Sequence, residues 1–108
     1  MNAVTRNLPC EPVIDGIPTM LAFTGQDVGP FFIHPGQPDS EHPPRGNWTV
    51  SHINTGYSVH KHIRTKARAI RMARQFAKVD CWDFTEAEQS RAISPDMLRL
   101  IADIRRGA

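Results

Sequence analysis

Histidine and cysteine side chains are the residues of this 108-residue chain that could bind a metal or act as bases and nucleophiles. His60 and His62 stand two apart in a predicted strand, which would place both imidazoles on one face as a two-ligand metal pair. A zinc site needs about three or four ligands. No Cys, Asp or Glu lies near this pair, and Lys61 and Arg64 would repel a cation. We therefore expect no bound metal and two exposed polar residues.

No combination of nucleophile and base stands out in the sequence. It contains no Gly-x-Ser-x-Gly, no Walker-type phosphate loop and no His-Glu-x-x-His. Cys10 and Cys81 have no zinc or redox spacing, and Asp80 and Asp83 would raise the pKa of the Cys81 thiol instead of activating it. His52, on the apolar face of a predicted strand, is expected to be a hydrogen-bonded core residue. We expect two free thiols, no catalytic residues, no cofactor and a protein that is not an enzyme.

Basic residues are concentrated in one segment of the chain. Residues 45–79 carry eight bases and no acid, a charge of +8, whereas the segments before and after it sum to −4 and −2. The planar guanidinium of arginine suits phosphate, and Arg68, Arg71 and Arg74 recur at a spacing that lines one side of a helix. The predicted binding residues, for phosphate or an acidic partner, are Arg64, Lys66, Arg68, Arg71, Arg74, Lys78, His60 and His62. Two interpretations stay open: an anion-binding surface, or a solvated helix face neutralised by the acidic flanks.

A β-hairpin is expected to carry the two histidines. Residues 48–54 and 57–63 are β-rich runs on either side of Thr55-Gly56, which is typical of a hairpin with a two-residue turn. The expected register pairs Trp48 with Ile63, and side chains then alternate between two faces. The face expected to be buried carries Trp48, Val50, Tyr57, Val59 and Ile63. The face expected to meet water carries Thr49, Ser51, Ser58, His60 and His62.

Three helices are expected after the hairpin. Thr65 is a suitable N-cap for a basic helix over residues 66–79. The apolar stripe by which this helix would pack on the hairpin is Ala69, Ile70, Ala73 and Phe76. A capping box at Thr85 predicts a short helix to about Ile93, and Ser-Pro-Asp predicts a last helix over about 95–106. The expected apolar side of that last helix is Met97, Leu98, Leu100, Ile101 and Ile104.

The N-terminal region is the least regular, because eight of the nine prolines lie in it. Residues 19–24 and 31–34 are possible short strands, joined by a connector of hairpin composition over 25–30. Residues 35–46 have the composition of a loop.

These elements together predict one α+β domain over residues 1–108. A small antiparallel sheet, made of the hairpin 48–63 and possible N-terminal strands, is packed by the basic helix 66–79 and two C-terminal helices. Three regions are expected within the domain. They are a Pro-rich N-terminal region (residues 1–46), a hairpin–helix core (residues 47–79) and a helical C-terminal region (residues 80–108).

The segment from Trp48 to Ala77 resembles the hairpin-plus-helix of small phage- and plasmid-borne proteins. Its skeleton is W-x-V-x-H, then T-G, an alternating strand, and T-K-x-x-A with Ala and Phe at helical spacing. It is also loosely similar to phage-integrase arm-binding and AP2-type DNA-binding domains, in which a three-stranded sheet enters the major groove. The resemblance covers about 30 of the 108 residues. It implies a nucleic-acid partner and an origin in a phage or other mobile element.

Length and hydropathy exclude several classes and leave two functions open. No apolar run approaches the ~20 residues of a membrane span, and residues 1–10 lack the apolar stretch of a signal peptide, so we expect a cytoplasmic protein without a membrane partner. The first function is a non-enzymatic nucleic-acid binder that uses the basic helix. The alternative is an anti-defence inhibitor or accessory protein of a mobile element, which binds an acidic host protein or nucleoprotein complex. No sequence pattern specifies an oligomeric state.

Overall fold

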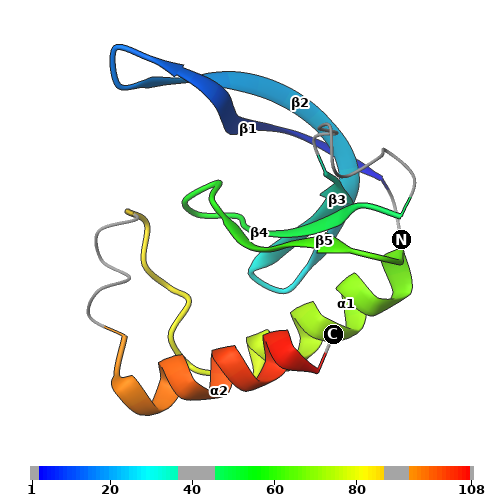
Figure 1. Cartoon of the computed structure of the whole chain (residues 1–108), viewed down its shortest axis with the longest axis vertical. Helices are drawn as coiled ribbons and strands as arrows, with labels where there is room; N and C mark the ends of the chain where they lie inside the picture. Colours follow the sequence, from blue (N-terminus) through cyan, green and yellow to red (C-terminus); the bar gives the residue numbers. More distant parts are fainter. Residues whose placement is uncertain (1–2, 37–45, 87–92, 108) are drawn as a thin grey trace.

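The computed structural model of the chain describes residues 3–36, 46–86 and 93–107 (Figure 1). Within these residues, one antiparallel sheet has the strand order β1-β2-β3-β4-β5. The strands are β1 (Val4–Ile14), β2 (Ile17–Val28), β3 (Phe31–Pro35), β4 (Trp48–His52) and β5 (Ser58–Ile63). The helices are α1 (Lys66–Ala77) and α2 (Pro95–Arg106). The predicted α+β class is confirmed.

Helix α1 packs on one face of the sheet and forms the main core with it. The Thr65 hydroxyl caps the helix by accepting from the Arg68 amide, as expected for an N-cap. The buried side of α1 consists of Ala69, Met72, Ala73 and Phe76. It meets Phe31, Ile33 and Val50 of the central strands, all of which are buried. The small side chains of Ala69 and Ala73 let the helix pack closely on the sheet. The helix ends at Ala77, two residues before the predicted end.

Helix α2 packs against the core through a narrower stripe than predicted. Ile101 is buried, with Met97 and Ile104 beside it in the core, whereas Leu98 and Leu100 are exposed, so their expected burial is wrong. At about 100° per residue, these two leucines point to either side of the stripe that meets α1. The predicted short helix between Thr85 and Ile93 falls mainly on positions outside the described residues.

The N-terminal region is far more regular than the sequence indicated. Strand β1 was not predicted, because Pro9 and Pro12 interrupt its sequence. Proline removes a backbone donor, but β1 lies at one edge of the sheet, where that loss is tolerated. The β1–β2 hairpin turns at Asp15-Gly16, both of which have positive φ, the conformation that suits strand twist. The antiparallel pair that the composition of residues 25–30 suggested is confirmed, but the connector is shorter than expected, since β2 continues to Val28 and pairs there with Phe31.

Strand β2 is strongly curved, so that the β1–β2 hairpin curls over the side of the sheet opposite the helices (Figure 1). Residues 17–25 pair with β1, and only residues 26–28 pair with β3. A Cβ at Gly25 would collide with the Ile33 carbonyl oxygen, so this approach requires glycine. The curl also brings the β4–β5 loop against β1, where a Cβ at Gly56 would lie 3.0 Å from Pro9 Cδ.

The β4–β5 hairpin has the predicted partners at its open end only. Trp48 pairs with Ile63 as expected, but Val50 pairs with His60, and residues 53–57 form a longer connection than a two-residue turn. Tyr57 is 54% exposed, so its expected burial is wrong. The face expected to meet water is also partly buried, since Thr49 and Ser51 are buried on the side that the β1–β2 hairpin covers. Periodicity within a strand shows which residues share a face, but not what covers that face.

Candidate functional site

The six predicted lysines and arginines all lie on the surface. Arg64 follows β5, Lys78 caps the end of α1, and the others lie on the helix. In the described part of the chain, none of the six takes part in an ion pair. The ion pairs found there are Arg6–Asp27, Arg99–Asp96 and Arg106–Asp103. Arg71, Arg74 and Lys78 follow one another at helical spacing opposite the buried side of α1. We call these three residues the basic stripe.

The other predicted binding residues, His60 and His62, face different sides of the sheet. His60 stands opposite Val50, and burial and the nearby Arg105 lower the pKa of its imidazole. His62 instead lines a cavity on the other side of the sheet and shares a hydrogen bond of 3.3 Å with Asn47 Oδ1. The expectation that both project from one strand face is therefore wrong, because a bulge separates them. Among the described residues, no group of three or more His, Cys, Asp or Glu side chains is placed to hold a metal ion.

The bulge follows directly from the strand pairing. Between the pairs Trp48–Ile63 and Val50–His60, β4 has one residue, Thr49, whereas β5 has two, Lys61 and His62. His62 takes a φ of +61°, which is uncommon for a residue with a side chain. Two consecutive residues, Lys61 and His62, consequently line the same cavity, which regular alternation would forbid.

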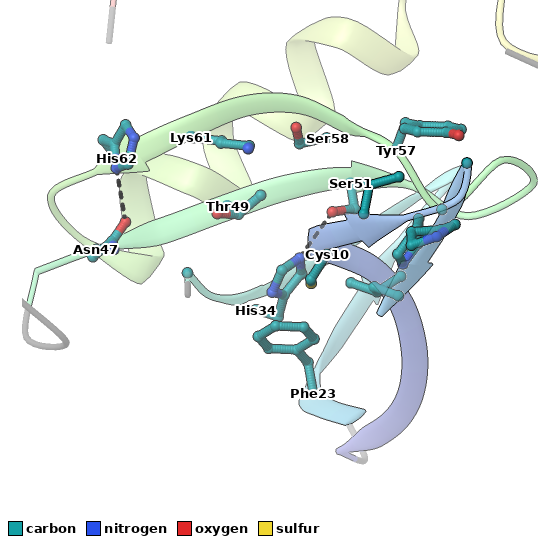
Figure 2. Close-up of a pocket in the computed structure, with 17 residues that line it drawn as sticks. Cys10, Phe23, His34, Asn47, Thr49, Ser51, Tyr57, Ser58, Lys61 and His62 are labelled. Atoms are coloured by element: carbon teal, nitrogen blue, oxygen red, sulfur yellow. Dashed lines mark hydrogen bonds between the residues drawn. The ribbon is translucent and has the colours of Figure 1, made fainter. Parts of the chain in front are cut away.

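This cavity is the second candidate site, and it was not expected from the sequence. It has a volume of about 500 Å³ and lies between the concave side of the sheet and the curled β1–β2 hairpin (Figure 2). Its polar lining includes Cys10, His34, Asn47, Thr49, Ser51, Ser58, Lys61 and His62. Its apolar lining includes Leu8, Pro9, Val13, Pro18 and Phe23. The residues come from all five strands or their connections, so local sequence spacing could not reveal them.

Two buried residues in the cavity wall, His34 and Ser51, form a hydrogen-bonded pair. His34 Nδ1 donates to the Pro35 carbonyl at 2.8 Å, and Nε2 lies 2.8 Å from Ser51 Oγ. Burial lowers the pKa of His34, so the ring is neutral at pH 7 and Nε2 accepts from the Ser51 hydroxyl. The pair has the hydrogen bond of a nucleophile and a base. However, Ser51 is only 2% exposed, and the imidazole lies against Phe23 and Phe32, which makes this pair part of the wall.

The remaining cavity donors are less constrained. In the described part of the chain, no side-chain hydrogen bond or ion pair involves Thr49, Ser58 or Lys61. Asn47 Nδ2 is buried and has no partner there either. Burial raises the pKa of the Cys10 thiol, and the positive charge of Lys61 opposes that shift. The polar alternation of Asn47, Thr49 and Ser51 was the available sequence signal, but it indicated a face open to water.

His52 and the residues after α1 belong to the core. His52 is buried, donates from Nε2 to the Trp82 carbonyl at 2.6 Å and has Nδ1 3.0 Å from the Thr55 hydroxyl, which confirms the predicted core histidine. Trp82 in turn donates to the Phe76 carbonyl at 2.6 Å. Cys81 beside it is a free, half-buried thiol whose pKa is raised by burial and by two neighbouring carboxylates. These contacts support the fold and leave no nucleophile poised among the described residues of this region.

Comparisons with family models, curated proteins and solved structures found no match to this chain. Within the described residues, neither helix has the length and apolar character needed to cross a membrane.

Proposed function

We propose that this protein is a non-enzymatic binding protein that uses the basic stripe and its neighbours on α1 to bind nucleic-acid phosphates. The observation that carries the proposal is that Arg71, Arg74 and Lys78 are exposed together and take part in no ion pair within the described residues. Exposed bases without partners are available to replace the counterions of a phosphate backbone.

The arrangement of neighbouring donors favours a backbone over a single small anion. Arg68, Arg71 and Gln75 border a shallow depression between α1 and α2. Lys66 lies on another side of α1, with its Nζ 6.0 Å from the centre of the Trp48 ring. The positive charge therefore extends along the helix instead of converging on one point. A surface of this kind contacts several phosphates and does not select a sequence.

The salt dependence of DNA affinity tests the proposal. We expect fluorescence anisotropy to show binding to random duplex at low salt, with log affinity falling by about 0.9 per neutralised phosphate for each log unit of salt. Arg71→Gln/Arg74→Gln should weaken binding to all sequences and flatten the slope by about 1.8. The matched control is Arg99→Gln/Arg106→Gln, which removes two exposed arginines whose charges are paired within α2. No association at low salt, or equal losses in both variants, contradicts phosphate binding.

A second candidate function, binding to a host protein, is favoured by the tip of the β1–β2 hairpin. Ile14, Ile17 and Met20, on either side of the turn at Asp15-Gly16, are between 57% and 71% exposed. Exposed apolar side chains gathered at one place mark interaction sites. If the resemblance to phage- and plasmid-borne proteins reflects origin, the partner is a host protein and the chain an inhibitor or accessory factor. Ile14→Ser/Ile17→Ser should then abolish capture of one host protein from nuclease-treated lysate, while Arg71→Gln/Arg74→Gln retains it.

A further inference from the structure

We propose that the cavity between the β1–β2 hairpin and the β4–β5 floor binds a small organic anion with an apolar body. The site is separate from the basic stripe, because α1 packs on the opposite face of the sheet. Its volume of about 500 Å³ lies within the range of small-molecule sites, roughly 300–1,000 Å³.

The charge of the cavity favours an anionic ligand. Lys61 of β5 contributes a positive charge to the lining, and the described lining residues include no Asp or Glu. Figure 2 shows Lys61 between His62 and Ser58 on β5, with Thr49 on the neighbouring strand. Thr49 stands opposite Lys61 and His62 in the bulge. The ammonium and the hydroxyls of Thr49 and Ser58 have no hydrogen-bond or ion-pair partner in the described part of the chain. A carboxylate or a phosphate would accept from these donors at the same time.

The bulge supports a binding role for this end of the cavity. A regular strand would send Lys61 and His62 to opposite faces, and only one of them could reach the cavity. The bulge turns both toward it, at the cost of a positive φ at His62. His62 is held in turn by its hydrogen bond with Asn47. The bulge therefore lets Lys61 line the same cavity as the hydroxyls of Thr49 and Ser58, which suits an anionic group.

The lining that the β1–β2 hairpin contributes to the cavity suits an apolar body. Leu8, Pro9 and Phe23 line it from the β1–β2 hairpin. Ser51 adds no further donor to the cavity, because its hydroxyl hydrogen is already given to the neutral His34. The ligand is therefore placed with its anionic group at Lys61, Thr49 and Ser58, and its hydrocarbon part under the hairpin.

An NMR titration of the full ¹⁵N-labelled chain with octanoate tests this site. We expect the amide signals of Thr49, Ser58 and Lys61 to shift together, and octanamide, the neutral analogue, to bind at least about tenfold more weakly. Octyl phosphate serves as a second arm. Tighter binding than octanoate identifies a phosphate head group and weaker binding identifies a carboxylate, and either order supports the proposal. Equal affinity for octanoate and octanamide, or shifts confined to Ile14 and Ile17 at the exposed tip, overturns it.

Substitutions separate this site from the basic stripe. Lys61→Met should weaken octanoate binding about tenfold, whereas Lys66→Met, which removes the same charge on α1, should not. Thr49→Val keeps the shape of a side chain that donates to no described residue, so the fold should persist while octanoate binding weakens.

Arg71→Gln/Arg74→Gln should leave octanoate binding intact. Thr49→Val should likewise leave DNA binding intact, so either proposal can fail without the other. Unchanged octanoate affinity in both Lys61→Met and Thr49→Val overturns the assignment.

Discussion

Phe76→Ala removes the aromatic ring at the centre of the contact between α1 and the sheet. Phe76 is fully buried, and its ring centre lies 5.9 Å from that of Phe31 and 6.0 Å from that of Trp82. The Trp82 indole donates to the Phe76 backbone carbonyl, which the alanine variant retains. The loss is therefore mainly one of packing, and we expect the free energy of unfolding to fall by about 3–5 kcal/mol. That is a large part of the ~5–15 kcal/mol available to a domain.

Urea denaturation followed by tryptophan fluorescence measures this change, because Trp82 reports on the same cluster. The midpoint should move to lower urea while the slope stays constant, as long as unfolding remains two-state. Tyr57→Ala is the matched control, since Tyr57 is also aromatic but 54% exposed, and its cost should be below about 1 kcal/mol. A loss below about 1.5 kcal/mol for Phe76→Ala, or equal losses in the two variants, would refute this packing.

Three further predictions concern the bend, the histidines and metal binding. Gly25→Ala should cost about 3 kcal/mol in urea denaturation, because its Cβ would strike the backbone of β3, whereas Gly107→Ala, at an open helix end, should cost little. Burial lowers the pKa of His34 and His60 below the ordinary 6.5, so the unfolded chain takes up these protons more readily. The free energy of unfolding should hold above about pH 6.5 and decrease below it, less steeply in His34→Gln. Zinc should leave the melting temperature unchanged, since the bulge separates His60 from His62; a chelator-reversible rise lost in His60→Ala/His62→Ala would contradict this.

Local signals in the sequence determined the helical part of the molecule. Thr65 and Ser94 cap α1 and α2 by accepting from amides three residues ahead, so each helix start could be identified from a short stretch of chain. The spacing of apolar residues every three or four positions, from which the burial of Phe76 was predicted, is also a local feature of the sequence. The pairing of Trp48 with Ile63 was predicted for the same reason, because both lie in one hairpin.

The tertiary structure alone decided the cavity and the positions of the two strand histidines. The cavity exists because β2 curves and carries β1 over the sheet, with Gly25 allowing the close approach to β3, which brings Cys10 near Lys61 across about 50 residues of chain. The bulge at Lys61 and His62 cannot be read from alternation, which assumes an equal number of residues on both strands. The spacing of apolar residues in the sequence indicates whether a segment forms a helix or a strand. Which strands pair, where they slip and what covers them depend on contacts between distant residues, and those contacts form only in the folded chain.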